Sequence, residues 1–539
     1  MRMTSTLFLI VVILVTGAPA AQAGTATLSG RFVVLRGDSP TEAVTAYVLI
    51  GADGSTAHLA VPEAVLAAAG GALALDRQAV TVTGVWSGAA LRVQSLEQAT
   101  GPRAAAPDTS QPWINVLCKF SDVAAEPKPP SYFDGLMSST YPGLDHFWRE
   151  LSYDQGNIAG SATIAGWLTL PQPRSYYVYG NPVALDWGRA IVDCTAVADA
   201  QVYFPDYSGI NLMFNANLDC CAWGGTWPLS IDGQYRMYSV TWEPPWGYAN
   251  QAVLAHEVGH GFGLPHSSGT YGQVYDNDWD VMSNAWLCGT SHPTYGCIGQ
   301  HTIAFHKDLL DWIPPAEKYV YPGTGQATIT LERLAEPQTS NYKFAEIRIG
   351  GSTEHFYTVE ARGQDGYDTQ LPGEAVIIHQ VDTGRDEPAH VIDIDGNGIT
   401  GDEGAMWRVG ETYTIPENGV PVSVISATSS GFVVAIGTPN APAVTELDPS
   451  AAPASGPGFV LTVRGTNFAA TSVVRWDGAD RATTFVSATE LRAAILPADI
   501  ASAGTATVTV NTPGAGTSAG VTFAIVNLPL RVYLPRVGR

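Results

Sequence analysis

The stretch HEVGHGFGLPH, which begins at His256, holds three of the chain's eleven histidines. His256 and His260 are four residues apart, so on a helix they lie about 40° apart around the axis and project from one face. Gly263 can end that helix by adopting a positive φ, and Pro265 prevents the helix from resuming. The chain can then double back and bring His266 beside the other two. This stretch constrains the fold most, because it predicts a helix, a sharp turn and three imidazoles that meet.

Three neutral imidazoles and one water form the open tetrahedral site of a catalytic zinc ion. We therefore expect His256, His260 and His266 to bind Zn²⁺. Glu257 lies about 60° from His260 around the same helix, close enough to act on the water as a general base without becoming a ligand. The alternative is that these are ordinary core histidines. The glycines in and near the helix argue against it, because each interior glycine costs about 1 kcal/mol relative to alanine.

The composition excludes some classes of partner. The 539 residues are too many for one ordinary core and predict several domains. The formal charge is −23 and the isoelectric point is near 4.7. A protein that binds nucleic acid needs clustered Lys and Arg to contact the phosphates, so we expect no nucleic-acid partner.

The N-terminus has the layout of a secretory signal over residues 1–23. Arg2 precedes the apolar run LFLIVVILV, and small residues follow up to Ala23, after which cleavage is expected. A membrane anchor is the alternative, but the run is well short of the roughly 20 residues that span a bilayer. No later segment reaches that length either. We therefore expect a secreted, extracellular protein without stable membrane insertion.

The cysteines suit an extracellular protein, because disulfides persist outside the cytoplasm. Six cysteines allow 15 pairings, and the spacing alone does not choose among them. Cys288 with Cys297 is the best local prediction, since this bond closes a short loop. A bond between the adjacent Cys220 and Cys221 is the least expected. The six are Cys118, Cys194, Cys220, Cys221, Cys288 and Cys297.

Changes in pattern along the chain divide it into segments. Alternating apolar and polar residues predict a small β domain, barrel-like, that could be a propeptide, and mixed strands and helices follow a polar linker. The expected fold class is therefore multidomain, with a central α+β domain flanked by β domains. The predicted segments are 1–23 (signal), 24–99 (small β domain), 100–112 (linker), 113–315 (catalytic domain), 316–439 (β-rich domain), 440–525 (β-sandwich) and 526–539 (tail).

The last domain carries a recognisable pattern. The segment FVLTVRGTNFAATSVVRWDG, with its Gly-Thr-Asn-Phe turn, resembles the immunoglobulin-like domains of the TIG type. The resemblance covers about 85 residues. It implies a β-sandwich that serves as a spacer or adhesion module and has no chemistry of its own.

The histidine stretch also carries a resemblance. It matches the extended zinc signature of the metzincin endopeptidases at His256, Glu257, His260, Gly263 and His266. The segment Asp280-Val281-Met282-Ser283 looks like the Met-turn of that clan, which implies that Met282 lies beneath the zinc. Position 284 is Asn, where astacin-like and serralysin-like members have a tyrosine, so a tyrosyl ligand is not expected. The resemblance implies a zinc metalloendopeptidase whose substrates are proteins or peptides.

Two subfamilies share further features with this chain. The segment DHFWRELSYDQGNIAGSATIAGWLTLP is similar to the gametolysin-like group. The segment HFYTVEARGQDGYDTQLPGEAVIIHQVD looks like the region after the catalytic domain in immune-inhibitor-A-like peptidases. Both resemblances imply the same activity. A substrate is expected to lie extended along the edge of a sheet strand that precedes the active helix.

A second metal is expected in the segment DIDGNGITGDEG. Asp393, Asp395 and Asn397 alternate before Gly398, as at the start of an EF-hand-like calcium loop. The twelfth position is Gly404 instead of the bidentate Glu, although Asp402 and Glu403 are near. The alternative to Ca²⁺ binding is a solvated acidic turn.

The sequence leaves latency and some alternative functions open. The segment 24–99 contains no cysteine, so it offers no thiol switch of the matrixin kind. The triplet Arg36-Gly37-Asp38 could offer an aspartate to the zinc or form an integrin-type motif, but a simple turn is the more usual reading. The chain could also be an adhesin that merely displays zinc, or a zinc hydrolase of non-peptide substrates. The general base Glu257 favours an enzyme.

Overall fold

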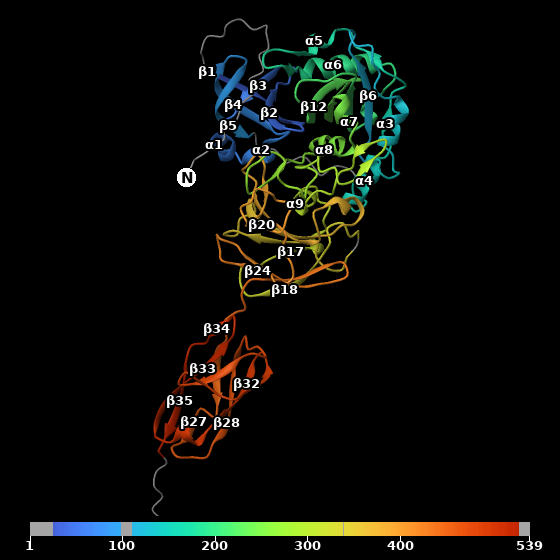
Figure 1. Ribbon diagram of the computed structural model, residues 1–539. Helices are drawn as coiled ribbons and strands as arrows, with labels where there is room; N and C mark the ends of the chain where they lie inside the picture. Colours follow the sequence, from blue (N-terminus) through green and yellow to red (C-terminus); the bar gives the residue numbers. More distant parts are fainter. Residues whose placement is uncertain (1–24, 99–109, 338, 528–539) are drawn as a thin grey trace, which may run out of the picture. The chain divides into compact units, whose positions relative to one another are not determined.

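The computed structural model describes residues 25–98, 110–337 and 339–527 (Figure 1). The predicted signal segment 1–23, nearly all of the linker and nearly all of the tail lie outside these residues. The chain is multidomain and mostly β, with 41% of residues in strands and 16% in helices. The described residues fold into two compact units, and residues 321–328, 413–423 and 435–527 form the second. None of the described helices is long and apolar enough to cross a membrane.

The first strands close into a ring. Strand β1 pairs with β4 through its first half and with β2 through its second half, and β2, β3, β5 and β4 complete the circle. Apolar side chains that include Phe32, Val34 and Leu91 fill the interior. The elements are β1 (Thr25–Ser39), β2 (Glu42–Ile50), β3 (Thr56–Ala60), α1 (Glu63–Ala68), α2 (Gly71–Leu75), β4 (Ala79–Ser87) and β5 (Ala90–Gln98).

Strand β1 is longer than the ring needs, and its end enters a second sheet. Residues Leu35 to Asp38 pair antiparallel with Gly225 to Ala222 of β12 (Ala222–Ile231). The segment expected to be a domain of its own is therefore continuous, through β1, with the sheet that follows, and both belong to the same compact unit. As a result, residues near the start of the chain lie beside the region of the histidines.

The second sheet runs in the order β1-β12-β13-β11-β6-β7, with β8 also on β6. Strands β13, β11 and β6 are parallel, whereas β12 is antiparallel to β13. The central strands read as continuous apolar runs because both of their faces are covered, as is usual for parallel strands. The strands are β6 (Trp113–Lys119), β7 (Ala162–Thr163), β8 (Leu168–Thr169), β11 (Gly209–Phe214) and β13 (Gln234–Glu243), with a separate pair β9 (Val178–Tyr179) and β10 (Ala184–Leu185).

Helices cover this sheet. The predicted amphipathic helix is present as α4, and Leu144, Phe147, Trp148 and Leu151 are all fully buried. Helix α8 is buried along its whole length and packs on β12 and β13. The helices are α3 (Pro130–Leu136), α4 (Leu144–Leu151), α5 (Arg174–Tyr177), α6 (Trp187–Ala198), α7 (Pro245–Tyr248), α8 (Gln251–Phe262) and α9 (Ala304–Leu309).

A third sheet begins directly after the last histidine. Strand β14 (Ser267–Gly269) pairs parallel with β22, and the order continues through β21, β20, β19 and β17. This sheet therefore joins the histidine segment to the region predicted as the β-rich domain. Its other strands are β17 (Lys318–Val320), β19 (Phe344–Arg348), β20 (His355–Arg362), β21 (Ala375–Asp382) and β22 (Ala389–Val391). A separate four-stranded sheet contains β18 (Ala327–Glu332), β23 (Thr412–Thr414), β24 (Pro421–Ala427) and β25 (Gly431–Ile436).

The C-terminal strands form a sandwich of two sheets. One has the order β26-β28-β32-β31, and the other is built on β27-β35-β33-β29-β30. Inward-facing residues such as Leu461, Val474 and Phe523 form their common core. The strands are β26 (Ala443–Asp448), β27 (Ala451–Pro453), β28 (Phe459–Thr466), β29 (Val473–Trp476), β30 (Ala479–Asp480), β31 (Thr483–Ser487), β32 (Glu490–Ile495), β33 (Gly504–Thr512), β34 (Gly516–Thr517) and β35 (Val521–Val526).

All six cysteines are paired. The predicted bond between Cys288 and Cys297 is confirmed, and it lies beside the short strands β15 (Ser291–His292) and β16 (Gly296–Cys297). A second bond joins Cys118 of β6 to Cys194 of α6. The expectation for the remaining pair was wrong, because Cys220 and Cys221 are bonded to each other.

Candidate metal centre

Helix α8 brings the first two histidines to one face and then stops. The helix ends at Phe262, and Gly263 follows with a left-handed φ of 99°, as the sequence predicted. The amide of Leu264 donates to the carbonyl of Gly259, which turns the chain back. His266 therefore lies next to His256 and His260, directly before β14.

The three imidazoles meet through their Nε2 atoms. The Nε2–Nε2 distances are 3.0 Å (His256–His260), 3.1 Å (His260–His266) and 3.2 Å (His256–His266), and all three side chains are buried. Nδ1 of His256 donates to the carbonyl of Val281, and Nδ1 of His260 donates to that of Leu264. These bonds leave the Nε2 lone pairs of both rings facing the common centre.

This donor set fits zinc. Three nitrogens at the usual Zn–N distance in a tetrahedral site lie about 3.3 Å from one another, close to the spacing of these three Nε2 atoms. Converging lone pairs in a buried site repel one another unless a cation lies between them. The arrangement therefore suits a metal better than it suits three core histidines.

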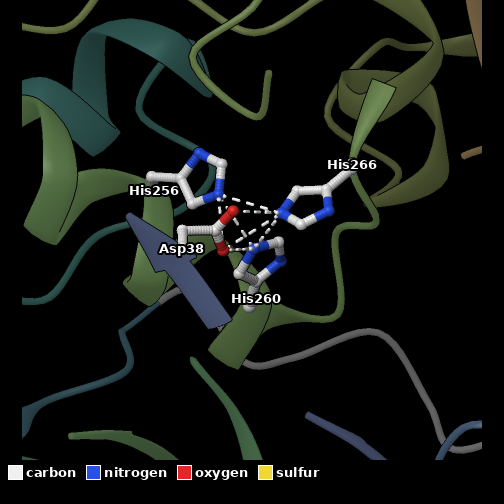
Figure 2. A group of neighbouring side chains, drawn as sticks. All are labelled: Asp38, His256, His260 and His266. Carbon is white, nitrogen blue, oxygen red and sulfur yellow. Dashed lines mark hydrogen bonds and ion pairs between the residues drawn. The ribbon is translucent and has the colours of Figure 1, made fainter. Parts of the chain in front are cut away.

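Asp38 completes the group, and the sequence did not select it as a site residue (Figure 2). Its carboxylate oxygens lie 3.0 Å from Nε2 of His266, 3.3 Å from that of His256 and 3.5 Å from that of His260. The reading of residues 36–38 as a simple turn was wrong: they belong to β1, and Asp38 is only 2% exposed. Burial raises the pKa of Asp38, but the facing histidines outweigh it and hold that pKa well below its usual range.

Glu257 lies beside this group without a partner. Its side chain is fully buried, and neither carboxylate oxygen has a hydrogen bond. The backbone of β12 passes close by, because a Cβ on Gly224 would lie 2.9 Å from Oε2 of Glu257. Burial, together with the negative charges of Asp38 and Glu243, raises the pKa of Glu257 well above its usual range.

Glu243, at the end of β13, is a second buried carboxylate that the sequence did not reveal. It is fully buried, both of its oxygens lack a partner, and burial raises the pKa of this group as well. A single Glu at the end of an apolar strand gives no local sign that its side chain will be buried near Glu257. Glu243 is also one of the groups whose charge raises the pKa of Glu257, after burial and Asp38.

Met282 packs under helix α8. It is fully buried, and a Cβ on Gly259 would overlap its sulfur atom, so the glycine permits the close approach. Asp280 holds this turn by accepting hydrogen bonds from the amide of Met282 and from the hydroxyls of Ser267 and Thr302. Its carboxylate also lies 3.0 Å from Nδ1 of His306. The segment that carries Met282 is thereby tied to the strand that follows His266.

Asn284, at the position where some metzincins have a tyrosine, points elsewhere. Its amide nitrogen donates to Asp278 over 2.6 Å. A different tyrosine reaches the site. The hydroxyl of Tyr275 lies 2.9 Å from Oδ1 of Asp38.

The acidic segment forms a second group with a different membership from the one expected. Asp393 and Asp395 lie together with Asp402, with their ligand atoms within 4.8 Å of one another. The amide nitrogen of Asn397 donates to the carboxylates of Asp395 and Asp402, so Asn397 supports the group through its NH₂ instead of offering an oxygen to it. Asp402 takes the place predicted for Asn397, because the loop folds back on itself. One oxygen of the buried Asp393 has no partner.

The resemblance seen in the last domain is confirmed by comparison with known families. Residues 442–525 match the family described as the IPT/TIG domain. A search of curated protein sequences found none that matches the chain. The domain that matches is the sandwich, and the residues around the histidines lie outside it.

Proposed function

We propose that this protein is a secreted zinc metalloendopeptidase of the metzincin type, with His256, His260 and His266 as the zinc ligands and Glu257 as the general base. One observation carries the proposal: three imidazole Nε2 atoms converge beside a buried carboxylate that has no other partner. The zinc signature and the Met-turn pattern support the same reading. When bound, Zn²⁺ lowers the pKa of a water ligand and polarises the scissile carbonyl.

Residues of the chain itself transfer the proton, orient the zinc ligands and support the site. The carboxylate of Glu257 takes a proton from the attacking water and passes it to the leaving amine. The hydrogen bonds from Nδ1 of His256 and His260 fix the orientation of the two rings. Met282 and Asp280 hold the floor of the site in place.

The N-terminal strand closes the site in the form seen here. An extended substrate needs the free edge of β12, and residues 35–38 of β1 are paired along that edge. Asp38 lies among the histidines, where a substrate would have to enter. We therefore propose that residues 24–99 act as a propeptide and that the protein is latent until β1 leaves the site.

The proposal extends to the second group and to the sandwich. We propose that Asp393, Asp395 and Asp402 bind Ca²⁺, which prefers carboxylate oxygens. The IPT/TIG domain then serves as a spacer or adhesion module. A non-catalytic adhesin built on the same fold is the alternative function, and the sandwich is the feature that favours it.

The decisive experiment compares two variants in a full-chain parent that carries Gly37→Val and Asp38→Ala. Asp38→Ala removes the carboxylate from the site, and the side chain added at position 37 overlaps the ring of Trp223 and is expected to release β1 from β12. In this parent we expect cleavage of a denatured protein such as casein, blocked by a zinc chelator. Adding Glu257→Ala should lower the rate by at least about 10²-fold while zinc content stays stoichiometric. Adding His260→Ala should remove both zinc and activity. Glu63→Ala, an exposed glutamate on α1, is the matched control. Near-normal proteolysis by Glu257→Ala, or a parent without zinc, would refute the proposal.

A further inference from the structure

Tyr275 lies in the loop between His266 and Met282, and its hydroxyl has a specific set of partners. It donates to Oδ1 of Asp38 over 2.9 Å or to the carbonyl of Glu42 over 2.7 Å, and it accepts from the amide of Ser39 over 3.2 Å. These partners lie at the end of β1 and at the start of β2. When β1 leaves the site, the hydroxyl loses all three hydrogen bonds together.

The oxygen that Tyr275 contacts, Oδ1 of Asp38, lies beside the proposed zinc ligands, where the reacting carbonyl of a substrate would bind. Oδ1 of Asp38 is 3.0 Å from Nε2 of His266, and the other oxygen of this carboxylate faces His256 and His260. The carboxylate thus places an anionic oxygen next to the three imidazoles. Within the described part of the chain, Tyr275 is the one side chain besides these histidines that is hydrogen-bonded to it.

We propose that Tyr275 is a catalytic residue of the active form, in which its hydroxyl donates a hydrogen bond to the oxygen of the reacting carbonyl. The inference rests on the proposed function, because it requires that a substrate carbonyl replaces the carboxylate of Asp38. Negative charge develops on that oxygen as water attacks, and a donor already positioned there stabilises the transition state more than the ground state. In the closed form the same hydroxyl instead holds Asp38.

The protonation state of Tyr275 suits a donor. Burial, followed by the charge of Asp38, raises the pKa of this phenol above its ordinary value of 10.0. The ordinary pKa of 10.0 alone keeps the phenol protonated at neutral pH. The hydroxyl therefore retains its proton when Asp38 departs.

The test uses the same full-chain parent, which carries Gly37→Val and Asp38→Ala so that β1 is released, and adds Tyr275→Phe, which removes only the hydroxyl. We expect kcat to fall about 10²-fold with little change in KM, as for other oxyanion donors, while zinc content stays the same. Tyr271→Phe is the matched control, because Tyr271 lies in the same loop and its hydroxyl contacts Asp395 instead. An unchanged or increased kcat in the Tyr275→Phe variant would overturn the proposal.

Two further measurements separate catalysis from structure. Calorimetry of the same variants should show that Tyr275→Phe weakens binding of a phosphinic peptide, a transition-state mimic, about 10²-fold while binding of a product peptide is unchanged. Equal losses for both ligands would assign Tyr275 a merely structural role and refute the inference. If the parent itself neither binds zinc nor cleaves casein, then the proposed function fails, independently of Tyr275.

The contact itself can be checked in the unmodified chain. The amide of Ser39 donates to the hydroxyl of Tyr275, so hydrogen exchange at Ser39 should be faster in Tyr275→Phe than in the wild type. Exchange within the barrel, for example in β4, should not change. Unaltered exchange at Ser39 would show that the closed form lacks the contact on which the inference stands.

Discussion

The two candidate metal sites in the described part of the chain differ in how they are built. Asp38 meets histidines more than 200 residues away, and all four side chains are at most 4% exposed. Asp393, Asp395 and Asp402 come from one short loop, and Asp395 is exposed. The first site is held by strand β1, helix α8 and the turn that precedes β14. The second brings carboxylates together within one loop, and the residues Thr270 and Tyr271 from outside the loop contact it through hydrogen bonds to Asp393 and Asp395.

The largest effect on zinc content and activity is expected from a substitution in the buried histidine site. In the parent that carries Gly37→Val and Asp38→Ala, His266→Ala removes a proposed zinc ligand and leaves no further carboxylate or imidazole of the group to replace it, so we expect loss of stoichiometric zinc and of all peptidase activity. Metal analysis of the purified variant, beside a casein assay in the same parent, measures both. Asp402→Asn, made in parallel, should retain its zinc. Loss of zinc from Asp402→Asn would show that the two clusters are not independent.

A smaller effect, on stability, is expected from Asp280, which supports the buried site. Asp280→Asn breaks a fully buried contact with His306, and we expect a loss of about 3 kcal/mol in the free energy of unfolding of the first unit. Burial raises the pKa of Asp280, but His306 and the hydroxyl donors outweigh it and hold the pKa below its ordinary 3.8. The contribution of Asp280 is therefore full above pH 3.8 and is lost as the pH falls through the lower value of the folded state.

Denaturant unfolding at neutral and acidic pH measures this effect. The difference in stability between the wild type and Asp280→Asn should be large at neutral pH and should shrink in strong acid. A difference that grows on acidification would contradict the assignment.

Removal of calcium should have a moderate effect that is confined to the second cluster. With calcium at about 100 times its dissociation constant, binding stabilises the folded state by about 2.7 kcal/mol. In a domain of this size, we expect the melting temperature to fall by about 5 °C on calcium removal. Calcium, but not magnesium, should restore it, and Asp402→Asn should abolish the response. A melting curve that does not depend on calcium in the wild type would leave this cluster as a solvated acidic turn.

The smallest effect concerns Asn397. Its amide donates to two carboxylates of the loop, so Asn397→Asp replaces these hydrogen bonds with repulsion between exposed charges. We expect a loss of under about 1 kcal/mol without calcium and a recovery when calcium is added. Melting curves with and without calcium test the sign. Destabilisation that calcium fails to reverse would argue against an ion at this position.

The same comparison shows what the sequence could predict. His256, His260 and His266 were found because helix geometry and a glycine turn place them together within eleven residues. The turn that carries Met282 was found from a short local pattern, and the TIG-like sandwich from its turn and its alternating strands. In each of these regions the decisive information is local.

Two of the residues that were missed, Asp38 and Glu243, depend on distant partners. Asp38 reads as part of a turn because nothing near it shows that β1 continues and pairs with β12, almost 190 residues away. Glu243 ends an apolar strand, and only the packing of α8 against β13 makes it part of the site. Asp402 replaced Asn397 because the acidic loop folds back on itself. The bond between Cys220 and Cys221 could not be preferred on spacing alone.

The sharing of β1 between the barrel and the large sheet has a consequence for activation. A cut between residues 98 and 110 would sever the covalent connection, but it would leave the pairing of β1 with β12 and the bond from Arg77 to the carbonyl of Gly261 intact. If residues 24–99 are the proposed propeptide, the cut converts an intramolecular inhibitor into a separate chain that must still dissociate. After the cut, the fraction of sites that the segment occupies depends on its concentration, because the segment is no longer covalently linked to the site. Dilution after cleavage, or destruction of the freed barrel by further proteolysis, becomes the step that sets how fast activity appears.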